Sequence, residues 1–571
     1  MSTRSAHIRA VALGLGMGLA LPGARAAAQG QRFEVTIAPE AHAGPVTGRL
    51  IVAVAKEEKP EPRLTISPRG PALFAIDLDQ LAPDRAAVVD NHAFGYPVSL
   101  AALPAGDYFV QAVVNVYEQV HRADGHTLWV HMNDGTVEFF NFAAGNLYSD
   151  VRPVHIGGGG AGTVRLAVTH VIPPHPPRAD TEWLKHVRIQ SRLLTQFWGR
   201  PVYINATVLL PMGYDQHPNT YYPSVYPLGH GPVPFQFTPD SAAEAGGGEP
   251  RATELRRGTR INPTSGLENG YDFYKSWTAA GFPRVVAITL EQETPYFPDS
   301  YSVNSANDGP YGDAIVEEVV PYLEEHFRII RKPYARQLEG ASTSGWQTLA
   351  MELQHPDVFG GGWVLQPDQI DFRHYQLTNI YADTNAFTMT YGQFTPIERS
   401  FQRTVEGQVL LTTRQLSRFE AVLGTHGRSG YQLEAWEAVF GPVGPDGYPV
   451  PLWDKVTGTI DHTVAAYMRD HGYDLRYYAQ QNWATLGPKL AGKLHFFAGD
   501  MDNYYLNLGV YDFQNFVDST ANPHSDADFT YGRPLKGHGW HSFTWAEMVE
   551  KMAAAVARDA PPGEPTTAWH Y

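Results

Sequence analysis

The chain contains no cysteine among its 571 residues. This absence excludes a disulfide framework, a thiol nucleophile and any thiolate-ligated metal site. Positive charge is also scarce: 43 lysines and arginines stand against 59 aspartates and glutamates, which gives a formal net charge of −16 without any long basic run. An acidic chain of this kind is poorly suited to bind nucleic acid or an anionic membrane, so neither is expected as a partner.

Long hydrophobic runs are equally scarce. The apolar run from Val11 to Leu21 is too short to span a bilayer, and no later run reaches the roughly 18 residues that a membrane span needs. Arg4 and Arg9 precede this run, and small residues follow it up to Ala28. This pattern is typical of a secretory signal peptide at residues 1–28, although an ordinary N-terminal helix is the alternative. We therefore expect an exported protein, either periplasmic or extracellular.

The length predicts two or three domains. Residues 31–171 read as strands separated by turns, and the β-branched and aromatic run Asp107–Tyr117 is typical of an inner strand. No catalytic grouping is found there, so we predict an accessory β-sandwich domain. The proline-rich stretch 172–180 is then a stiff linker.

Strand-like and helix-like segments alternate over residues 181–558. This alternation predicts an α/β domain with a mostly parallel sheet covered on both faces by helices. The alternation is lost over residues 373–487, which we interpret as a helical cap or lid insertion. Residues 559–571 are expected to form a tail. The helix-like segments lie at Thr181–Gln190, Asp313–Arg328, Arg414–Leu423, Tyr431–Val439, Thr459–His471 and Trp545–Ala557.

The most informative stretch is Gly340-Ala341-Ser342-Thr343-Ser344-Gly345, which joins a strand-like run to the helix-like run Trp346–Gln354. A serine on a tight strand-to-helix turn is the layout of a nucleophile elbow, in which the hydroxyl is lifted clear of the sheet. The usual pattern is Gly-x-Ser-x-Gly. Here Ser344 occupies the position of the second glycine, and Gly345 follows one residue later.

A nucleophilic serine needs a base to accept its proton and a carboxylate to orient that base. Asp500 and Asp502 follow a later strand, and His538 and His541 lie in the loop before the last helix. The order serine, carboxylate, histidine is that of α/β-hydrolases. A metal site is the alternative for these histidines and aspartates, but no His-x-x-x-His or similar spacing is present.

In these motifs the chain resembles the esterase family of α/β-hydrolases that includes feruloyl esterases, enterochelin-type esterases and S-formylglutathione hydrolases. The similarity lies in Asp313–Glu324, in the elbow and in Lys536-Gly537-His538-Gly539-Trp540, and it spans roughly residues 200–370 and 490–557. The β-rich N-terminal region and the insertion lie outside it.

The resemblance implies Ser342 as the nucleophile. It favours Asp502 over Asp500, because Gly499-Asp500-Met501-Asp502 matches a Gly-x-x-Asp turn. It favours His538 over His541, because Gly537-His538-Gly539-Trp540 matches a Gly-His-x-Trp pattern. The His230-Gly231 pair resembles the loop that supplies one oxyanion donor. The backbone amide of Gly231, or of a residue beyond Pro232, would act together with that of Thr343.

The expected function is therefore an exported serine esterase that acts on small-molecule or carbohydrate-linked esters, with no cofactor and no metal. A peptidase or an acyltransferase on the same fold is the alternative within catalysis. A non-catalytic glycan-binding protein with a decayed hydrolase core is the alternative outside it. Ser344 is the feature that keeps that last interpretation open, and the chain has 30 tyrosines and 12 tryptophans that suit either sugar stacking or core packing. Neither the substrate nor the oligomeric state can be read from the sequence.

Overall fold

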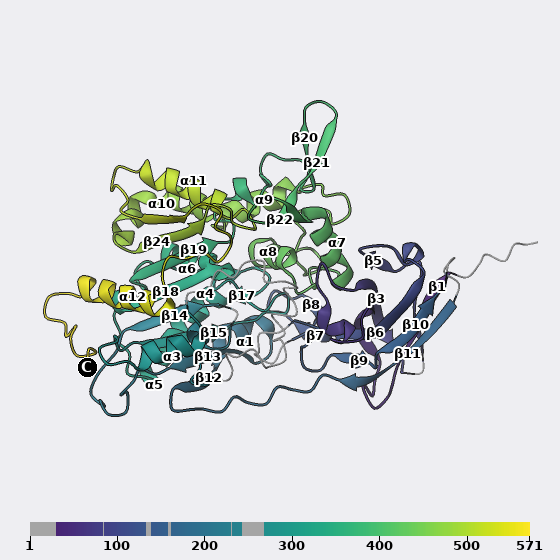
Figure 1. Ribbon diagram of the computed structural model, residues 1–571, viewed down its shortest axis with the longest axis horizontal. Helices are drawn as coiled ribbons and strands as arrows, with labels where there is room; N and C mark the ends of the chain where they lie inside the picture. The colour runs from purple at the N-terminus through teal and green to yellow at the C-terminus, as the bar shows by residue number, and fades with distance from the viewer. Residues whose placement is uncertain (1–29, 84, 133–138, 158–161, 230, 242–267) are drawn as a thin grey trace, which may run out of the picture.

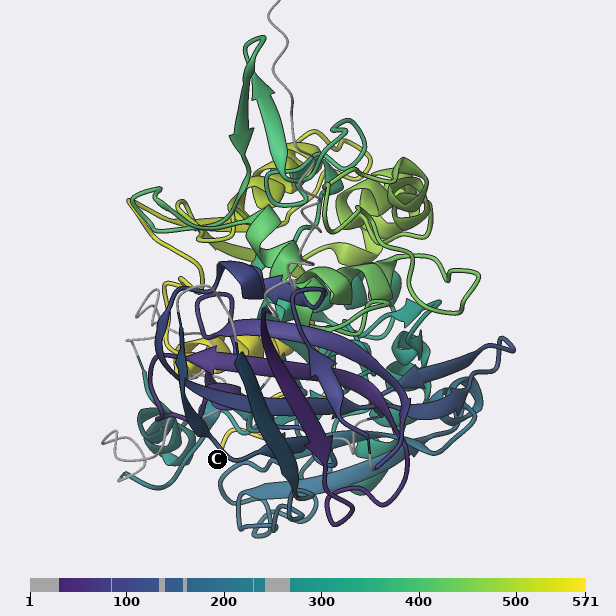
Figure 2. The same ribbon diagram turned by 90° about the vertical axis from the view of Figure 1, so that its right-hand side faces the viewer.

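The computed structural model describes residues 30–83, 85–132, 139–157, 162–229, 231–241 and 268–571, which form two large sheets with helices packed around them (Figures 1 and 2). The predicted signal peptide at residues 1–28 and His230 lie outside the described residues. The predicted linker 172–180 has no regular secondary structure.

The N-terminal region is all-β, but it is one nine-stranded sheet and not the two sheets of the predicted sandwich. The strand order is β4-β1-β11-β9-β6-β2-β3-β5, with β10 paired to the first half of β6. The strands are β1 (Gln31–Ile37), β2 (Val46–Ala55), β3 (Ala72–Leu81), β4 (Ala87–Val89), β5 (Phe94–Tyr96), β6 (Gly106–Val116), β9 (Leu147–Ser149), β10 (Arg152–Ile156) and β11 (Gly162–Val171).

This sheet folds over on itself. Phe33 of β1 and Phe74 of β3 lie far apart in the strand order, yet their ring centroids are 6.5 Å apart. Both belong to a buried apolar cluster to which β1, β11 and β4 contribute from one half of the sheet and β2, β3 and β6 from the other. The continuous sheet therefore buries one face between its own halves, as a sandwich does.

The other face of β2 and β3 packs against the insertion. Helix α7 (Thr413–Leu423) places Phe419 edge-on to Tyr96 of β5, with ring centroids 5.4 Å apart. The buried Arg49 of β2 donates from Nε to the carbonyl oxygen of Val422 at 3.1 Å and from Nη1 to Asp77 at 3.0 Å. A charged bond to the last carbonyls of a helix is favourable, so Arg49 fixes the N-terminal sheet to the end of α7.

The second sheet has eight strands in the order β12-β13-β15-β14-β18-β19-β24-β25. Strand β13 is antiparallel to both β12 and β15, and every pairing from β15 to β25 is parallel. This is the mostly parallel sheet that the sequence predicts. Its strands are β12 (Leu184–Ser191), β13 (Val202–Leu209), β14 (Ser224–Leu228), β15 (Val286–Glu291), β18 (Arg336–Ser342), β19 (Gly361–Pro367), β24 (Leu494–Gly499) and β25 (Asp528–Gly532).

Helices cover both faces of this sheet (Figure 1). Successive side chains of a strand point to opposite faces. Accordingly, Val364 of β19 packs in the cluster with α6, α10 and α11, whereas Trp363 and Leu365 pack with α3 and α12. The helices are α1 (Arg192–Trp198), α3 (Gly270–Thr278), α6 (Thr343–Gln354), α10 (Leu475–Leu490), α11 (Asn507–Asp518) and α12 (Trp545–Asp559), together with α4 (Tyr311–Ala314) and α5 (Val320–His326), which are joined by a π-helical turn.

The prediction of a helix over 181–190 is wrong. Residues Leu184–Ser191 form the edge strand β12, and the first helix of this region, α1, begins at Arg192. The strand pairs with β13 over its whole length, from Leu184 opposite Leu209 to Ser191 opposite Val202. Its apolar residues fit helical spacing locally, but pairing with the edge of β13 makes this segment a strand.

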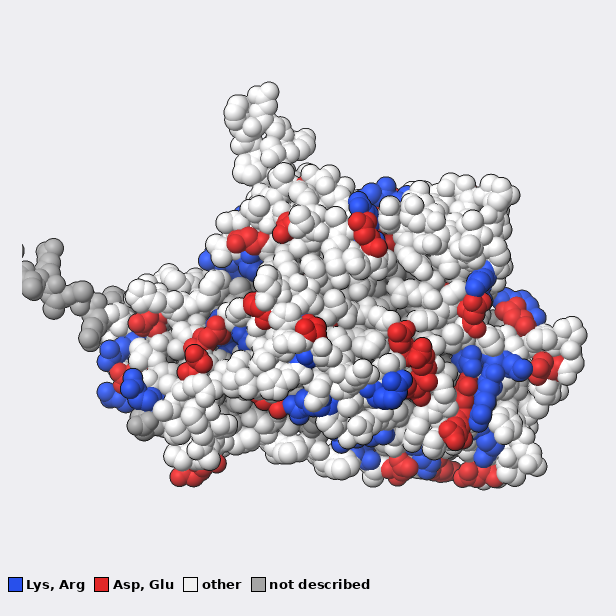
Figure 3. All heavy atoms as spheres, turned by 180° about the vertical axis from the view of Figure 1, so that it is seen from behind, with Lys and Arg blue, Asp and Glu red and all other residues white. Residues whose placement is uncertain are grey.

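The insertion 373–487 contains more than the predicted helices. Helices α7, α8 (Gln432–Phe440) and α9 (His462–Asp470) correspond to three predicted segments, and the long helix α10 was not predicted. Two hairpins were also not predicted: β20–β21 (Thr388–Tyr391, Thr395–Glu398) and β22–β23 (Ser400–Arg403, Val409–Thr412). The first projects from the body of the molecule (Figures 1 and 3) and exposes 70% of Tyr391 and 89% of Phe394.

The predicted tail is in part docked on the core. Trp569 is buried, and its carbonyl oxygen accepts a hydrogen bond from the backbone N–H of Arg284 at 3.1 Å.

On the face shown in Figure 3, lysines and arginines are interspersed with aspartates and glutamates. No helix within the described ranges is long and apolar enough to cross a lipid bilayer.

Candidate active site

Ser342 lies at the junction of β18 and α6, as the elbow motif predicts. Its backbone has φ 62° and ψ −122°, a region that non-glycine residues rarely adopt. Strain of this kind persists only where surrounding structure enforces it, and it is typical of functional sites. The turn presents the Ser342 side chain at the carboxyl edge of the sheet.

Two glycines make this tight turn possible. A Cβ on Gly340 would lie 2.3 Å from the carbonyl oxygen of Ser344. A Cβ on Gly345 would lie 2.6 Å from the carbonyl oxygen of Leu365 in the neighbouring strand. Both contacts are with backbone atoms, which cannot move aside cheaply. The close approach of helix to strand is therefore provided by positions 340 and 345.

Ser344 itself is accommodated in the turn. It is buried in the first turn of α6, and its Oγ lies 4.0 Å from the Cβ that Gly229 would carry. The side chain therefore points toward the loop that follows β14. The departure from the usual motif is compatible with an intact elbow, because Gly340 leaves room for the Ser344 Cβ.

Asp502 follows β24 and is completely buried. Its Oδ1 accepts hydrogen bonds from the backbone N–H groups of Tyr504 at 2.8 Å and Leu506 at 3.2 Å. Its Oδ2 lies 2.8 Å from Nδ1 of His538. The carboxylate is thus held by the turn on one side and faces the imidazole with the other, which is the arrangement that orients a histidine base.

His538 lies in the loop between β25 and α12. Its backbone N–H donates to Oδ1 of Asn503 at 2.9 Å, and its ring meets the ring of Tyr504 edge-on at 4.9 Å between centroids. The side chain is 21% exposed, so the imidazole is reachable from solvent while its partner Asp502 is not. The structure thus brings together two of the three predicted triad residues in direct contact.

Asp500 and His541, the alternative candidates for the acid and the base, each bond a nearby backbone group. Asp500 accepts at Oδ1 from the backbone N–H of Lys536 at 2.9 Å, which ties the loop before His538 to the acid turn. His541 is buried, and its Nδ1–H donates to the carbonyl oxygen of Phe543 at 2.5 Å. Burial lowers the pKa of His541. Both side chains bond local backbone groups, which accounts for their positions.

The two candidate oxyanion donors follow neighbouring strand ends. Thr343 is the first residue of α6, after β18, and Gly231 lies in the exposed loop after β14, which pairs with β18. The amide of Thr343 belongs to the first turn of a helix, where backbone N–H groups lack intrahelical acceptors. The oxyanion role of both residues stays a prediction.

The insertion contributes directly to the acid turn. Arg403, at the end of β22, donates from Nε to the carbonyl oxygen of Asp502 at 3.0 Å. Its backbone N–H donates to the carbonyl of Asn503 at 2.9 Å, and its carbonyl accepts from Nδ2 of Asn503 at 2.8 Å. This contact could not be expected from the sequence, because Arg403 lies about 100 residues before the turn that it holds.

Asp368 is the site residue that the sequence analysis missed. It directly follows β19, is buried, and its Oδ1 lies 3.2 Å from Oγ of Ser342. Its backbone N–H donates to the carbonyl oxygen of Ser342 at 2.9 Å. Burial raises the pKa of Asp368. The rule that working groups follow the carboxyl ends of parallel strands would have pointed to this aspartate.

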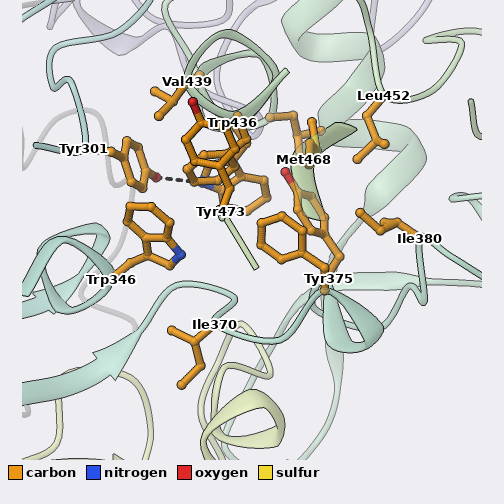
Figure 4. Close-up of a cluster of buried hydrophobic side chains, with 14 of the residues drawn as sticks. Tyr301, Trp346, Ile370, Tyr375, Ile380, Trp436, Val439, Leu452, Met468 and Tyr473 are labelled. Atoms are coloured by element: carbon orange, nitrogen blue, oxygen red, sulfur yellow. Dashed lines mark hydrogen bonds between the residues drawn. The ribbon is translucent and has the colours of Figure 1, made fainter. Parts of the chain in front are cut away.

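Three polar side chains surround the other oxygen of Asp368. Oδ2 lies 2.8 Å from Oη of Tyr301, 3.1 Å from Oγ1 of Thr343 and 3.2 Å from Nε2 of Gln432 in α8. Nε1 of Trp436, also in α8, donates to Oη of Tyr301 at 2.6 Å (dashed line in Figure 4). The insertion therefore reaches the nucleophile region through Tyr301.

Among the described residues, no group of three or more His, Asp or Glu side chains could hold a metal ion. The groups that the site does present are a serine in a strained turn, a histidine–carboxylate pair and the amides at the start of α6.

No family model and no curated protein matches the chain. Among solved structures, a ferulic acid esterase is 13% identical; the match covers 66% of this chain and 97% of that chain, with a TM-score of 0.35. S-formylglutathione hydrolases from Agrobacterium tumefaciens and Staphylococcus aureus are 12% and 14% identical. They cover 67% and 65% of this chain and 98% of their own, with TM-scores of 0.30 and 0.29.

Proposed function

We propose that this chain is a serine hydrolase of the α/β-hydrolase type that hydrolyses carboxylic esters through Ser342, His538 and Asp502. The observation that carries the proposal is the 2.8 Å contact between Asp502 and His538. Asp502 follows β24 and His538 follows β25, at one end of the strand order. Ser342 ends β18, two strands away from β24, in a strained turn. We propose that these groups, which are far apart in the chain, act together at the carboxyl edge of the sheet.

The first step is attack of Ser342 on the ester carbonyl carbon. Because Nδ1–H of His538 donates to Asp502, Nε2 is the nitrogen that accepts a proton. It takes the hydroxyl proton as Oγ forms its bond to carbon. The buried Asp502 carboxylate stabilises the imidazolium that results.

The tetrahedral intermediate places negative charge on the former carbonyl oxygen. We assign the Thr343 amide to this oxygen, together with the Gly231 amide or one beyond Pro232. Such donors each contribute about 3 kcal/mol to lowering the barrier in comparable sites. The imidazolium then protonates the leaving alcohol, and the acyl group stays on Ser342. Water, deprotonated by His538, attacks the acyl carbon and releases the acid.

We propose small-molecule or carbohydrate-linked esters as the substrate class. We also propose export through the leader at residues 1–28, for which the basic, apolar and small-residue order of the sequence is the support. Secretion by a bacterial host, followed by N-terminal sequencing of the mature protein, tests the export proposal.

Hydrolysis of short p-nitrophenyl esters tests the catalytic proposal. We expect turnover by the native chain and its loss in Ser342→Ala, with Ser344→Ala as the matched control because Ser344 lies in the same turn without reaching the proposed chemistry. A panel of acetyl, feruloyl and peptide substrates then separates an esterase from a peptidase. Full activity in Ser342→Ala would contradict the proposal.

A further inference from the structure

The two oxygens of Asp368 have different surroundings. Oδ2 lies within hydrogen-bond distance of three groups: Tyr301 Oη, Thr343 Oγ1 and Gln432 Nε2. Tyr301 Oη accepts hydrogen bonds from Trp436 Nε1 and Gln432 Nε2, which are both donors only. Its own hydrogen is directed to Oδ2 at 2.8 Å, which is a nearer acceptor than Oγ1 of Thr343 at 3.3 Å. An oxygen that receives hydrogens from this many donors is an acceptor in every protonation state.

A proton on Asp368 must consequently reside on Oδ1. That oxygen faces Oγ of Ser342 at 3.2 Å. Burial favours the neutral carboxyl, since it raises the pKa of Asp368 above its ordinary range. The one position of Asp368 that gains and loses a proton is thus directed at the proposed nucleophile.

The Ser342 hydroxyl has a single hydrogen to donate. When Asp368 is ionised, that hydrogen is directed to Oδ1, and it is then unavailable to His538. When Asp368 is protonated, Oδ1–H donates to a lone pair of Oγ, and the serine hydrogen is available to Nε2 of His538. Protonation therefore reverses the direction of one hydrogen bond without moving a heavy atom.

We propose that Asp368 is a positioning residue whose protonation state sets the direction of the Ser342 hydroxyl. The neutral acid aligns the nucleophile with its base, and the carboxylate diverts it. This inference rests on the proposed role of Ser342 and adds a fourth residue to that site. The groups whose charge acts on or with Asp368 are His538, Tyr301, Tyr375 and Asp299; α6 and α8 contribute the neutral Thr343 and Gln432.

Asp368→Asn separates the two states. Because the three groups around Oδ2 require an acceptor, the amide oxygen takes that place and the NH2 group faces Ser342. The amide therefore reproduces the neutral acid at every pH. We expect Asp368→Asn to keep kcat/KM within a few-fold of the native enzyme at low pH. The ratio of variant to native should then rise with pH, approaching tenfold per pH unit once Asp368 is ionised.

Two further variants make the result specific. Tyr301→Phe removes a donor from Oδ2, which disfavours the carboxylate, so the alkaline decline of the native activity should move to higher pH. Asp474→Asn is the matched control: Asp474 is also buried and accepts from a tyrosine, Tyr381, at 2.7 Å, but it caps α10. Its ratio to native should not depend on pH. Circular dichroism and the thermal midpoint establish that each variant is folded.

The rate at which a fluorophosphonate probe labels Ser342 is the second readout, because it reports the reactivity of the nucleophile without ester binding. A pH-independent ratio for a folded Asp368→Asn, in both assays, would overturn the inference. A low ratio at every pH would also overturn it. The proposed function fails separately, if native protein is neither labelled at Ser342 nor active on esters.

Discussion

His538 and His541 stand three residues apart but have different surroundings. His538 contacts the buried Asp502, whereas His541 is enclosed and bonded to the carbonyl of Phe543. We expect His538→Ala to lower kcat/KM by roughly 10³ or more, because the serine loses its base. His541→Ala should keep most activity and reduce thermal stability instead. Steady-state kinetics of both variants checks this, and loss of turnover in His541→Ala alone would move the base to that residue.

The same comparison applies to the two aspartates of the acid turn. Asp502→Asn replaces the carboxylate that orients His538, so kcat should fall by about 10³ to 10⁴. Asp500→Asn changes a side chain that bonds the backbone of Lys536, so kcat should change less than tenfold. The measurement is kcat for each variant at saturating ester. Equal losses in the two would contradict the assignment of Asp502.

Individual site residues could be predicted from the sequence where a short motif surrounds them. Asp502 and His538 were chosen from motifs, and the structure places them in contact. Asp368 and Arg403 could not be chosen in that way. Asp368 follows a strand without any motif around it, and Arg403 acts through backbone groups of a turn that is remote in sequence.

At the scale of the element, the elbow depends on a glycine one residue later than the usual pattern. A methyl group at position 345 would lie 2.6 Å from the Leu365 carbonyl oxygen and 2.9 Å from Cα of Pro367. We expect Gly345→Ala to lower the free energy of unfolding by about 1–3 kcal/mol and to reduce kcat, because α6 and β19 must separate.

Ser344→Ala is the control for this substitution, since residue 344 already carries a Cβ, and it should leave both quantities near native. Urea denaturation and ester kinetics measure the two effects. A Gly345→Ala variant as stable as the native chain would show that the helix approaches the strand less closely than the structure has it.

Elements with strong local patterns could be predicted, and others could not. The extended run before the elbow and the helix Trp545–Ala557 were predicted, and they correspond to β18 and α12. The edge strand β12 was mistaken for a helix, because its state is decided by pairing with β13 and not by its own residues. Helix α10 was missed, since Gly487 and Pro488 near its end read as a turn.

At the scale of the whole molecule, the alternation of strands and helices predicted a mixed α/β architecture, and the structure has it. The continuity of the N-terminal sheet could not be predicted, since it depends on the short strand β9 pairing with both β11 and β6. The same holds for the docking of that sheet on α7 through Arg49. Both features depend on pairings between distant segments, about which local periodicity carries no information.

Buried acids make the stability of the molecule depend on pH. Burial raises the pKa of Glu339 in β18 from 4.5 to about 8. Between these values the folded chain binds more protons than the unfolded chain, so the free energy of unfolding falls as pH rises. This contribution is fully present below about pH 4.5 and is lost as pH rises through about 8. For one group the slope is about 1.4 kcal/mol per pH unit.

Glu339→Gln removes this dependence. The difference in stability between the variant and the native chain should therefore grow in favour of the variant from pH 5 to pH 9. Urea denaturation at several pH values measures it. Glu352 and Asp299, each with a pKa raised to about 7 by burial, act in the same direction and remain in both proteins. A difference that is constant with pH would contradict a neutral, buried Glu339.

The central claim is that Ser342 is a nucleophile activated by His538. The most direct measurement is peptide mapping by mass spectrometry after reaction of the intact protein with a fluorophosphonate probe. We predict one adduct, on the peptide that contains Ser342, and its loss in Ser342→Ala and in His538→Ala but not in His541→Ala. An unlabelled native protein, or an adduct on another serine, would contradict the account.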